Sequence, residues 1–550
     1  MKIGVDLDNT IVNYERAFLA SAAHLKIYLP FSVNTKSKIR DYISSRSEGE
    51  VVWQKLQGLA YGKFAVTHAE IYPGVKRFLW RCRERGHKVV IASHKTNYGH
   101  QDTEKIPLRK VALDLLLKMG ITVEEEQFVD SVTFHDTYED KISFIENQCF
   151  DWFIDDLIEV IKDLQDVSQL KTIHFSQDLN QKIYKLTDGQ VGITLSNWQH
   201  IDSVINGEWS HSELNQIAFE LVRCKITNIQ KLSNGGNGGV FRASLTDGRN
   251  VKLKIYPIDP HHDRIFSEIL VSKALSLSDP KYISAMIVSD RDLDIGVFDW
   301  IEGTIVTYVE EIDLQATLTF LKTLDALKKS NLFLNAPLAS AACFSGLDIE
   351  NQINNRIAQF NLPRIQYPEL ESFFNKSFFP TAKNLIHWSR ENWPKQDGYF
   401  NSLSKSEWCL SPSDFGFHNA IRLENGSLVF TDFEYFGWDD PVKLMLDFIY
   451  HPGMSLSDEQ KNYWLKRALN IYGEHHFERM SVFRPLYGLI WCLILLNDFR
   501  SDVWERRISA NESKRIEKNT ILSNQLDKAQ KLIAELRLNY SKEFQMENHT

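Results

Sequence analysis

The stretch Ile3-Gly4-Val5-Asp6-Leu7-Asp8-Asn9-Thr10 decides the fold of the first part of the chain. An apolar, strand-like run leads into Asp6 and Asp8, which occupy alternate positions. At the end of a strand, the turning backbone can place two such carboxylates around one ligand. Paired carboxylates there suit a magnesium ion, a nucleophile and an acid/base group. The stretch therefore predicts a catalytic site at the carboxyl end of a β-strand.

Short apolar runs and helical patterns alternate over roughly the first 200 residues. Helical patterns cover Val75–Glu84 and Pro107–Met119. This rhythm predicts an α/β domain with a doubly wound, mainly parallel sheet. The expected strands are Ile3–Val5, Lys88–Ala92, Gln127–Val129, Trp152–Ile154 and Thr172–Phe175. Residues from about 14 to 70 lack a strand rhythm and are expected to form a small helical cap.

Four motifs appear in order along this region and resemble those of the haloacid dehalogenase superfamily of phosphatases. The resemblance extends over roughly residues 1–205, and three of the motifs directly follow predicted strands. The motifs are Asp6-Leu7-Asp8-Asn9-Thr10, Ser93, Lys141 and Asp155-Asp156.

The resemblance implies a role for each motif residue. Asp6 is expected to attack the phosphorus, and Asp8 to protonate the leaving group and then activate water. Ser93 and Lys141 are expected to hold the phosphoryl oxygens. Mg²⁺ is expected on Asp6, on the backbone carbonyl of Asp8, and on Asp155 or Asp156, between which the sequence does not choose. His94 and Lys95 either touch the substrate or lie solvated in the loop.

A polar stretch from Asn206 to Ser212 marks the expected domain boundary. The predicted domains are 1–207, a phosphatase domain, and 213–550, a second domain with lobes of about 213–305 and 306–550. The second domain begins with a strand, a glycine-rich turn and further strands, and continues mostly as helices. Its most apolar stretch, Leu486–Leu496, is predicted to be a buried helix too short to span a bilayer.

A second group of candidate catalytic residues lies in the segment Ser413-Asp414-Phe415-Gly416-Phe417-His418-Asn419. Asn419 follows Asp414 by 419 − 414 = 5 residues, and Asp432 follows Asn419 by 432 − 419 = 13 residues. This spacing is typical of a catalytic loop with a base, Asp414, and two magnesium ligands, Asn419 and Asp432. His418 is expected to pack within its loop.

Upstream residues supply parts for nucleotide binding. Glycines between two strands let backbone amides approach phosphates, and Gly236, Gly238 and Gly239 are the candidates. Lys252 and Lys254 share one face of the following strand, and Lys254 matches the expected phosphate contact better. Glu268 is its expected ion partner.

Together these features resemble the aminoglycoside phosphotransferase and choline kinase family over about residues 215–460. The resemblance implies an α+β, bilobal, protein-kinase-like domain that uses ATP and Mg²⁺. Pro412 and Ser413 depart from the family pattern, where a histidine and a glycine or arginine are usual. Without an arginine before Asp414, a small-molecule acceptor is favoured over a protein.

Composition limits the remaining choices. The net charge of −9 argues against a general nucleic-acid-binding surface. The six cysteines are scattered without a C-x-x-C pair, which favours reduced thiols in a cytoplasmic protein. No membrane partner is expected, and the sequence does not give the oligomeric state.

These observations predict a bifunctional enzyme, a magnesium-dependent phosphatase fused to an ATP-dependent small-molecule kinase. The expected partners are a nucleotide, a phosphorylated small molecule and a hydroxyl acceptor, with sugar, polyol or amino-alcohol phosphates favoured. Two alternatives stay open. One is a nucleic-acid end-processing phosphatase and kinase, although the chain has no G-x-x-x-x-G-K-[ST] loop. The other is a regulatory protein with one inactive domain.

Overall fold

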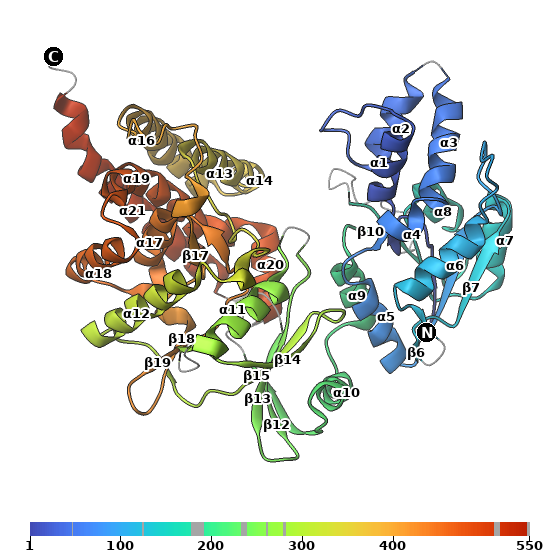
Figure 1. The fold of residues 1–550 in the computed structure, drawn as a ribbon, viewed down its shortest axis with the longest axis horizontal. Helices are drawn as coiled ribbons and strands as arrows, with labels where there is room; N and C mark the ends of the chain where they lie inside the picture. Colours follow the sequence, from blue (N-terminus) through green and yellow to red (C-terminus); the bar gives the residue numbers. More distant parts are fainter. Residues whose placement is uncertain are drawn as a thin grey trace. The chain divides into compact units, whose positions relative to one another are not determined.

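The computed structural model describes residues 1–46, 48–123, 126–177, 192–232, 239–259, 262–278, 282–510 and 517–546. The chain has a mixed α/β fold and forms two compact units (Figure 1). The first comprises Met1–Glu220 with Arg291–Asp294, and the second comprises Leu221–Asp290 with Ile295–Thr550.

A six-stranded sheet in the order β10-β9-β8-β1-β4-β7 forms the centre of the first unit, and all of its strand pairs are parallel. The expected strands at its centre are confirmed, but the strand predicted at Gln127–Val129 is wrong. Its place in the sheet is taken by β7, a half-buried edge strand without a continuous apolar run. The bounds are β1 Lys2–Val5, β4 Lys88–His94, β7 Ser131–His135, β8 Trp152–Asp155, β9 Lys171–Phe175 and β10 Gly192–Leu195.

Helices cover both faces of this sheet. Alternate residues of β4 point to two separate cores, because side chains alternate across a strand. Val89 and Ile91 join the larger core with α5, α6 and α9, whereas Val90 and Ala92 join a smaller core with α7 and α8. The bounds are α5 Val75–Glu84, α6 Leu108–Lys118, α7 Tyr138–Asn147, α8 Ile158–Asp163 and α9 Trp198–Asn206. Two short strands, β5 Thr122–Val123 and β6 Glu126–Gln127, form a separate hairpin.

A helical segment lies between the short paired strands β2 (Val12–Asn13) and β3 (Glu70–Ile71). Its helices are α1 Glu15–His24, α2 Lys36–Ser44, α3 Gly49–Tyr61 and α4 Ala65–His68. Three of them, α1, α2 and α3, stand together at one end of the unit, and α4 lies beside α6 (Figure 1). Phe18 stacks on Trp53 at a ring-centroid distance of 5.2 Å and joins two of them.

Helix α10 (His211–Val222) belongs largely to the first unit, which extends to Glu220. Glu213 is buried and accepts hydrogen bonds from Arg81 of α5 at 2.9 Å and from Arg85, the residue after α5, at 2.7 Å. Arg81 also pairs with Asp202 at 2.8 Å. These buried ion pairs tie α10 to the helical layer of the first unit.

An antiparallel five-stranded sheet in the order β11-β12-β13-β15-β14 opens the second unit. Gly236 and Gly238 lie outside the described residues, whereas Gly239 begins β12. A Cβ at Gly239 would lie 2.8 Å from the ring of Phe241, so this position excludes a side chain. The bounds are β11 Ile226–Lys231, β12 Gly239–Leu245, β13 Asn250–Ile255, β14 Met286–Asp290 and β15 Ile295–Asp299, with helix α11 at Arg264–Ser278.

Helices and small sheets complete the second unit. β16 (Thr304–Ile305), β18 (Ala420–Arg422) and β19 (Leu428–Phe430) form one small sheet, and β17 (Cys409–Ser411) pairs with β20 (Gly437–Asp439). The α-helices are α12 Glu311–Leu327, α13 Gly346–Ala358, α14 Asn361–Gln366, α15 Pro368–Phe373, α16 Phe379–Glu391, α17 Pro441–Tyr450, α18 Asp458–Tyr472, α19 His476–Leu495, α20 Ser501–Ala510 and α21 Lys518–Met546.

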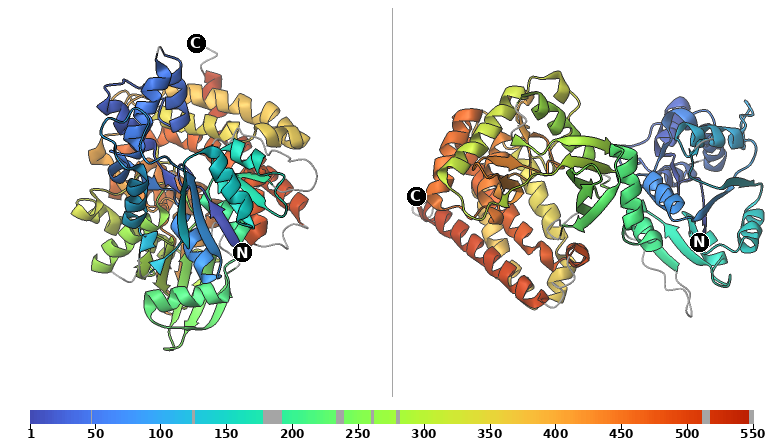
Figure 2. Two further views of the ribbon diagram at one scale, coloured as in Figure 1. Left: turned by 90° about the vertical axis from the view of Figure 1, so that its right-hand side faces the viewer. Right: turned by 90° about the horizontal axis from the view of Figure 1, so that it is seen from below.

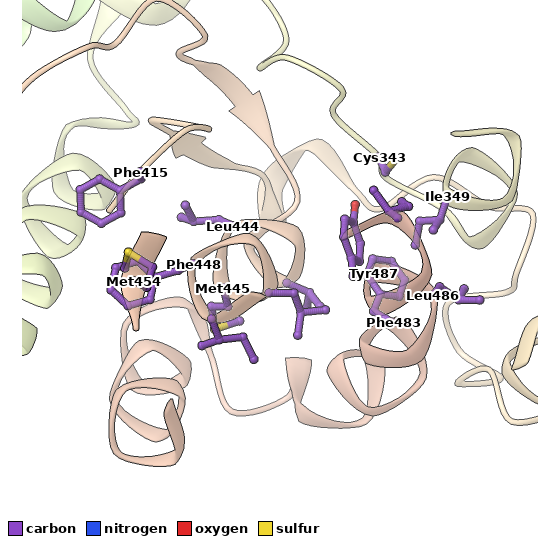
Figure 3. Close-up of a cluster of buried hydrophobic side chains, with 14 of the residues drawn as sticks. Cys343, Ile349, Phe415, Leu444, Met445, Phe448, Met454, Phe483, Leu486 and Tyr487 are labelled. Carbon is purple, nitrogen blue, oxygen red and sulfur yellow. The ribbon is translucent and has the colours of Figure 1, made fainter. Parts of the chain in front are cut away.

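Helix α19 is the centre of the helical core. Together with the turn that follows it, to Phe499, it is long and apolar enough to cross a membrane by length and composition, so the helix is longer than the stretch Leu486–Leu496 singled out in the sequence. The prediction of a buried helix is confirmed, because 72% of its most apolar window is buried in the protein. Figure 3 shows Phe483, Leu486 and Tyr487 of α19 in this core, and α21 lies along α19 (Figure 2).

Candidate functional site

The first candidate site lies at the carboxyl ends of three neighbouring strands. Asp6 follows β1, Asp155 ends β8 and Ser93 lies near the end of β4. Lys141, from α7, donates hydrogen bonds to Asp6 at 2.7 Å and to Asp155 at 2.6 Å. All four side chains are buried. The parallel topology therefore brings the sequence-predicted residues together, as ligand sites in α/β sheets require.

The electrostatics of this site are dominated by crowded carboxylates. Burial raises the pKa of Asp6 well above its usual range, Lys141 opposes this effect, and the neighbouring aspartates add to it. Burial also raises the pKa of Asp156 to about 7, against the opposing effect of Lys36. Such crowding disfavours the charged forms unless a cation is present.

The residues fit a magnesium ion. Oxygen atoms of Asp6, Asp155 and Asp156 lie within 4.8 Å of one another, and carboxylate oxygens are the ligands that Mg²⁺ prefers. The sequence did not choose between Asp155 and Asp156, and the structure groups both with Asp6. Asp155 also accepts a hydrogen bond from the backbone N–H of Leu157 at 2.9 Å.

Two buried hydroxyl groups point to a ligand. The Oγ atom of Ser93 and the Oγ1 atom of Thr10 have no hydrogen-bond partner within the described ranges. A buried polar group without a partner is costly, so such groups in a native fold call for an explanation. Phosphoryl oxygens are acceptors that would satisfy both.

Three residues around Asp8 were missed or left open by the sequence. Lys95 is buried and pairs with Asp8 at 2.8 Å, whereas its neighbour His94 is exposed. The ammonium of Lys95 also lies 4.7 Å from the ring centre of Tyr61 in α3. Lys36, at the start of α2, lies 4.0 Å from Asp156. No sequence signal marks Lys36 or Tyr61, because both sit in a helical insertion without a motif.

The second candidate site is centred on Lys254 of β13. Its ammonium donates to Glu268 of α11 at 2.9 Å, lies 3.1 Å from Glu434, and forms a further ion pair with Asp432. The neighbouring Lys252 instead points its ammonium at the ring of Phe298, 4.3 Å away. The structure therefore brings Lys254, and not Lys252, to the acidic residues.

Glu434 is a member of this site that the sequence did not single out. It is buried and also pairs with Arg264 at 2.7 Å. Burial raises the pKa of Glu434, with Lys254 opposing the effect. Its place two residues after Asp432 was the available signal.

The loop around Asn419 brings the two predicted magnesium ligands together. The Asn419 side chain donates from Nδ2 to the backbone carbonyl of Asp414 at 2.9 Å, and the Thr431 N–H donates to the Asn419 carbonyl at 2.9 Å. Asp432 and Ser413 both adopt left-handed backbone, with φ of 71° and 64°. Strained backbone of this kind concentrates at functional sites. An amide oxygen and a carboxylate fit a magnesium ion here.

Asp414 is held by two histidines. His418 contacts it at 3.0 Å, so it does more than pack in its loop, and His451 lies 3.8 Å from the same oxygen. Although burial alone would raise the pKa of Asp414, the hydrogen bond and charge of His418 bring it below its ordinary value. Asp414 is therefore ionised at neutral pH, as a proton acceptor must be.

Comparisons with known proteins give only distant similarity. No family model matches the sequence, and no curated protein matches it. Among solved structures, the chain is similar to choline kinase LicA from Streptococcus pneumoniae, at 16% identity over 59% of this chain and 100% of that one, with a TM-score of 0.39. It is also similar to spectinomycin phosphotransferase APH(9)-Ia in complex with ADP and spectinomycin, at 11% identity over 58% and 97%, with a TM-score of 0.42.

A third solved structure, the gentamicin complex of APH(2'')-IIa, is similar at 16% identity over 57% of this chain and 96% of that one, with a TM-score of 0.38. These neighbours are kinases of the choline kinase and aminoglycoside phosphotransferase type. At such identities and TM-scores the similarity does not define an activity, so the functional assignment depends on the geometry of the two sites.

Proposed function

We propose that the protein is a bifunctional enzyme, with a magnesium-dependent phosphatase in the first unit and an ATP-dependent small-molecule kinase in the second. One observation carries the proposal. In each unit, candidate carboxylates converge on a single buried lysine: Asp6 and Asp155 on Lys141, and Glu268 and Asp432 on Lys254. Both arrangements suit the handling of phosphoryl groups, which need fixed positive charge beside carboxylates that bind a metal.

In the phosphatase site, Asp6 is the nucleophile. It attacks the phosphorus, the bond to the leaving oxygen breaks, and Asp8 donates a proton to that oxygen. Asp8 then takes a proton from water, which releases phosphate from Asp6. Lys141 favours the ionised form of Asp6 against the effect of burial, and Ser93 donates to a phosphoryl oxygen. Magnesium on Asp6, Asp155 and Asp156 would offset negative charge on the phosphoryl group.

In the kinase site, Asp414 accepts the proton of the acceptor hydroxyl and does not bond to phosphorus. Lys254 contacts nucleotide phosphates, and Glu268 holds its ammonium in place. Magnesium on Asn419 and Asp432 would offset the charge of the transferring phosphoryl group. Gly239 allows close approach of the β12 backbone to the nucleotide.

The substrate class is inferred from the pairing of the two activities. Removal and addition of phosphate in one chain suits consecutive steps on one metabolite, such as a sugar, polyol or amino-alcohol phosphate of a surface-polysaccharide precursor. This step is an analogy at the level of fold and site. Location in the cytoplasm, the absence of nucleic-acid partners and the domain boundary at 207–213 remain predictions.

Two single variants test the proposal. Asp6→Asn is expected to abolish phosphate release from a panel of phosphosugars and polyol phosphates, and to leave ATP-dependent phosphorylation intact. Asp414→Asn is expected to do the reverse, with a loss of about 10²–10⁴-fold. If neither variant changed turnover of any substrate, the bifunctional assignment would be wrong. Loss of one activity alone, with the other absent from the wild type, would instead favour a regulatory protein with one inactive domain.

A further inference from the structure

Two stacked imidazoles face one oxygen of the proposed catalytic base. The rings of His418 and His451 lie parallel, with centroids 3.9 Å apart and planes 12° apart. Their Nε2 atoms lie 3.0 Å and 3.8 Å from the same atom, Oδ1 of Asp414. His418 belongs to the catalytic loop, whereas His451 follows α17. Neither imidazole uses the second carboxylate oxygen, Oδ2.

The hydrogen bonds define which nitrogen of each ring carries the proton. The Gly453 N–H donates to Nδ1 of His451 at 3.1 Å, so in the neutral ring the hydrogen is on Nε2. Burial lowers the pKa of His451 to about 4, and the ring is therefore neutral at pH 7. Nδ1 of His418 is buried with no partner among the described residues, while its Nε2 faces an ionised carboxylate. Both rings thus direct an N–H at Asp414.

A bound metal ion fits this arrangement less well. Ligand atoms of Asp414, His418 and His451 lie within 4.8 Å of one another, which satisfies distance alone. A histidine bound to a metal through Nε2 carries its hydrogen on Nδ1 and donates it to a neighbouring acceptor. Here Nδ1 of His451 faces a donor, and Nδ1 of His418 has no acceptor within the described residues.

The pair is supported from behind by rigid packing. The ring of His451 meets Trp491 edge-on at 5.2 Å, and Trp491 donates its indole N–H to Asp447 at 3.0 Å. The Phe417 N–H donates to the sulfur of Met454 at 3.3 Å. Figure 3 shows Met454 and Phe448 on the same side of the core as Phe415 of the catalytic loop. Held in this way, the imidazoles cannot easily turn from the carboxylate.

We propose that His418 and His451 are positioning residues of the kinase site: the N–H of His418 holds Oδ1 of Asp414, and His451 stacks on His418 and directs its own N–H toward the same oxygen from 3.8 Å, which leaves Oδ2 to accept the proton of the acceptor hydroxyl. The inference rests on the proposed kinase function. It also gives a physical role to a departure from the family pattern, because Pro412 occupies the place where a histidine is usual. Two histidines downstream orient the loop's aspartate instead.

The test compares variants that keep the ring stacking but remove the N–H. His418→Phe is expected to lower kcat for ATP-dependent phosphorylation of the best acceptor by about tenfold or more, with an unchanged KM for ATP. His418→Gln, which retains an N–H donor, is expected to recover most of kcat. His451→Phe is expected to have a smaller effect, because its contact is longer. Where no acceptor is turned over, ATP hydrolysis by the same variants is the readout.

A matched control exists in the same unit. The ring of His475 lies 4.1 Å from that of His476, with the planes tilted by 39°, and His475 contacts Glu407 at 3.2 Å, but it lies outside the catalytic loop. His475→Phe is expected to leave kcat and KM unchanged. Thermal unfolding of every variant separates lost positioning from lost folding, and His418→Gln serves if the phenylalanine variant does not fold.

The outcomes separate the positioning role of the histidines from the kinase function itself. Wild-type kcat in His418→Phe, together with an inactive Asp414→Asn, would overturn the positioning role and leave the kinase function standing. Full activity of Asp414→Asn would overturn the kinase function itself. Inhibition of the wild type by stoichiometric zinc, relieved in His418→Phe, would show a metal site and overturn the proposal.

Discussion

The two candidate sites use similar groups in different architectures. In the first, Asp6, Ser93 and Asp155 all come from carboxyl ends of adjacent strands in one sheet, and Lys141 comes from a helix packed on it. In the second, Lys254 comes from the antiparallel sheet, whereas Asp432 follows β19 in another sheet, 178 residues later. The first site is therefore a product of one sheet's topology, and the second of ion pairs that join separate layers of its unit.

The two sites are therefore expected to respond differently to the loss of one residue. Removal of a residue from the first site leaves the strand ends in place, because backbone hydrogen bonds hold them. Removal of Lys254 also removes the charge that draws Glu268, Asp432 and Glu434 together. Four substitutions test this difference between the two sites.

Lys141→Met has the largest expected effect. Phosphate release is expected to fall by about 10³-fold, because Asp6 loses the cation that favours its ionised form and the phosphoryl group loses a donor. Kinase activity is expected to be unchanged. The measurement is kcat/KM on a phosphomonoester, with Lys171→Met, an exposed lysine at the start of β9, as the control. An equal loss in both activities would show a folding defect instead.

Lys254→Met is expected to lower ATP-dependent transfer by about 10²-fold and to raise KM for ATP. Three carboxylates would then face one another without their shared cation. Lys252→Met on the same strand is the matched control, since its ammonium faces the ring of Phe298. Similar losses in both variants would mean that the choice of Lys254 is wrong.

Acid is expected to destabilise the second unit through His451. The pKa of His451 is about 4 in the folded protein and about 6.5 in the unfolded chain. Between these pH values the imidazole is protonated in the unfolded chain and neutral in the folded protein. The free energy of unfolding therefore decreases by about 3 kcal/mol as the pH falls from 6.5 to 4, because neutral His451 stabilises the fold only above this range. Urea unfolding at several pH values measures the slope. His451→Phe is expected to reduce it, and His387→Phe, at an exposed site, is not.

Lys36→Met has the smallest expected effect. Lys36 lies 4.0 Å from Asp156 and adds positive charge beside the first candidate site. Its removal is expected to lower kcat/KM for phosphate release by about tenfold, mostly through a higher KM, because the substrate loses one electrostatic contact. Lys38→Met, on the exposed side of the same helix, is the control. A loss confined to kcat would place Lys36 in the chemical step instead of in binding.

Much of the first site was predictable because its signals are local. Three of the four motifs follow strands whose apolar runs are visible in the sequence, and parallel strands bring their carboxyl ends to one edge. The edge strand β7 escaped prediction, since a half-buried strand lacks a continuous apolar run. The roles of Lys36 and Tyr61 could not be predicted either, because the sequence of a helical insertion without a motif does not show which of its residues face the site.

The sequence by itself determined the identity and spacing of the aspartates, the strands that precede them and Lys254 as the better of two candidates. Only the tertiary structure decided that Lys95 pairs with Asp8, that Glu434 joins Lys254, and that His418 and His451 share an oxygen of Asp414. The physical reason is the range of the interactions. Strand periodicity is a property of neighbouring residues, whereas ion pairs and ring contacts form between residues that only the folded chain brings together.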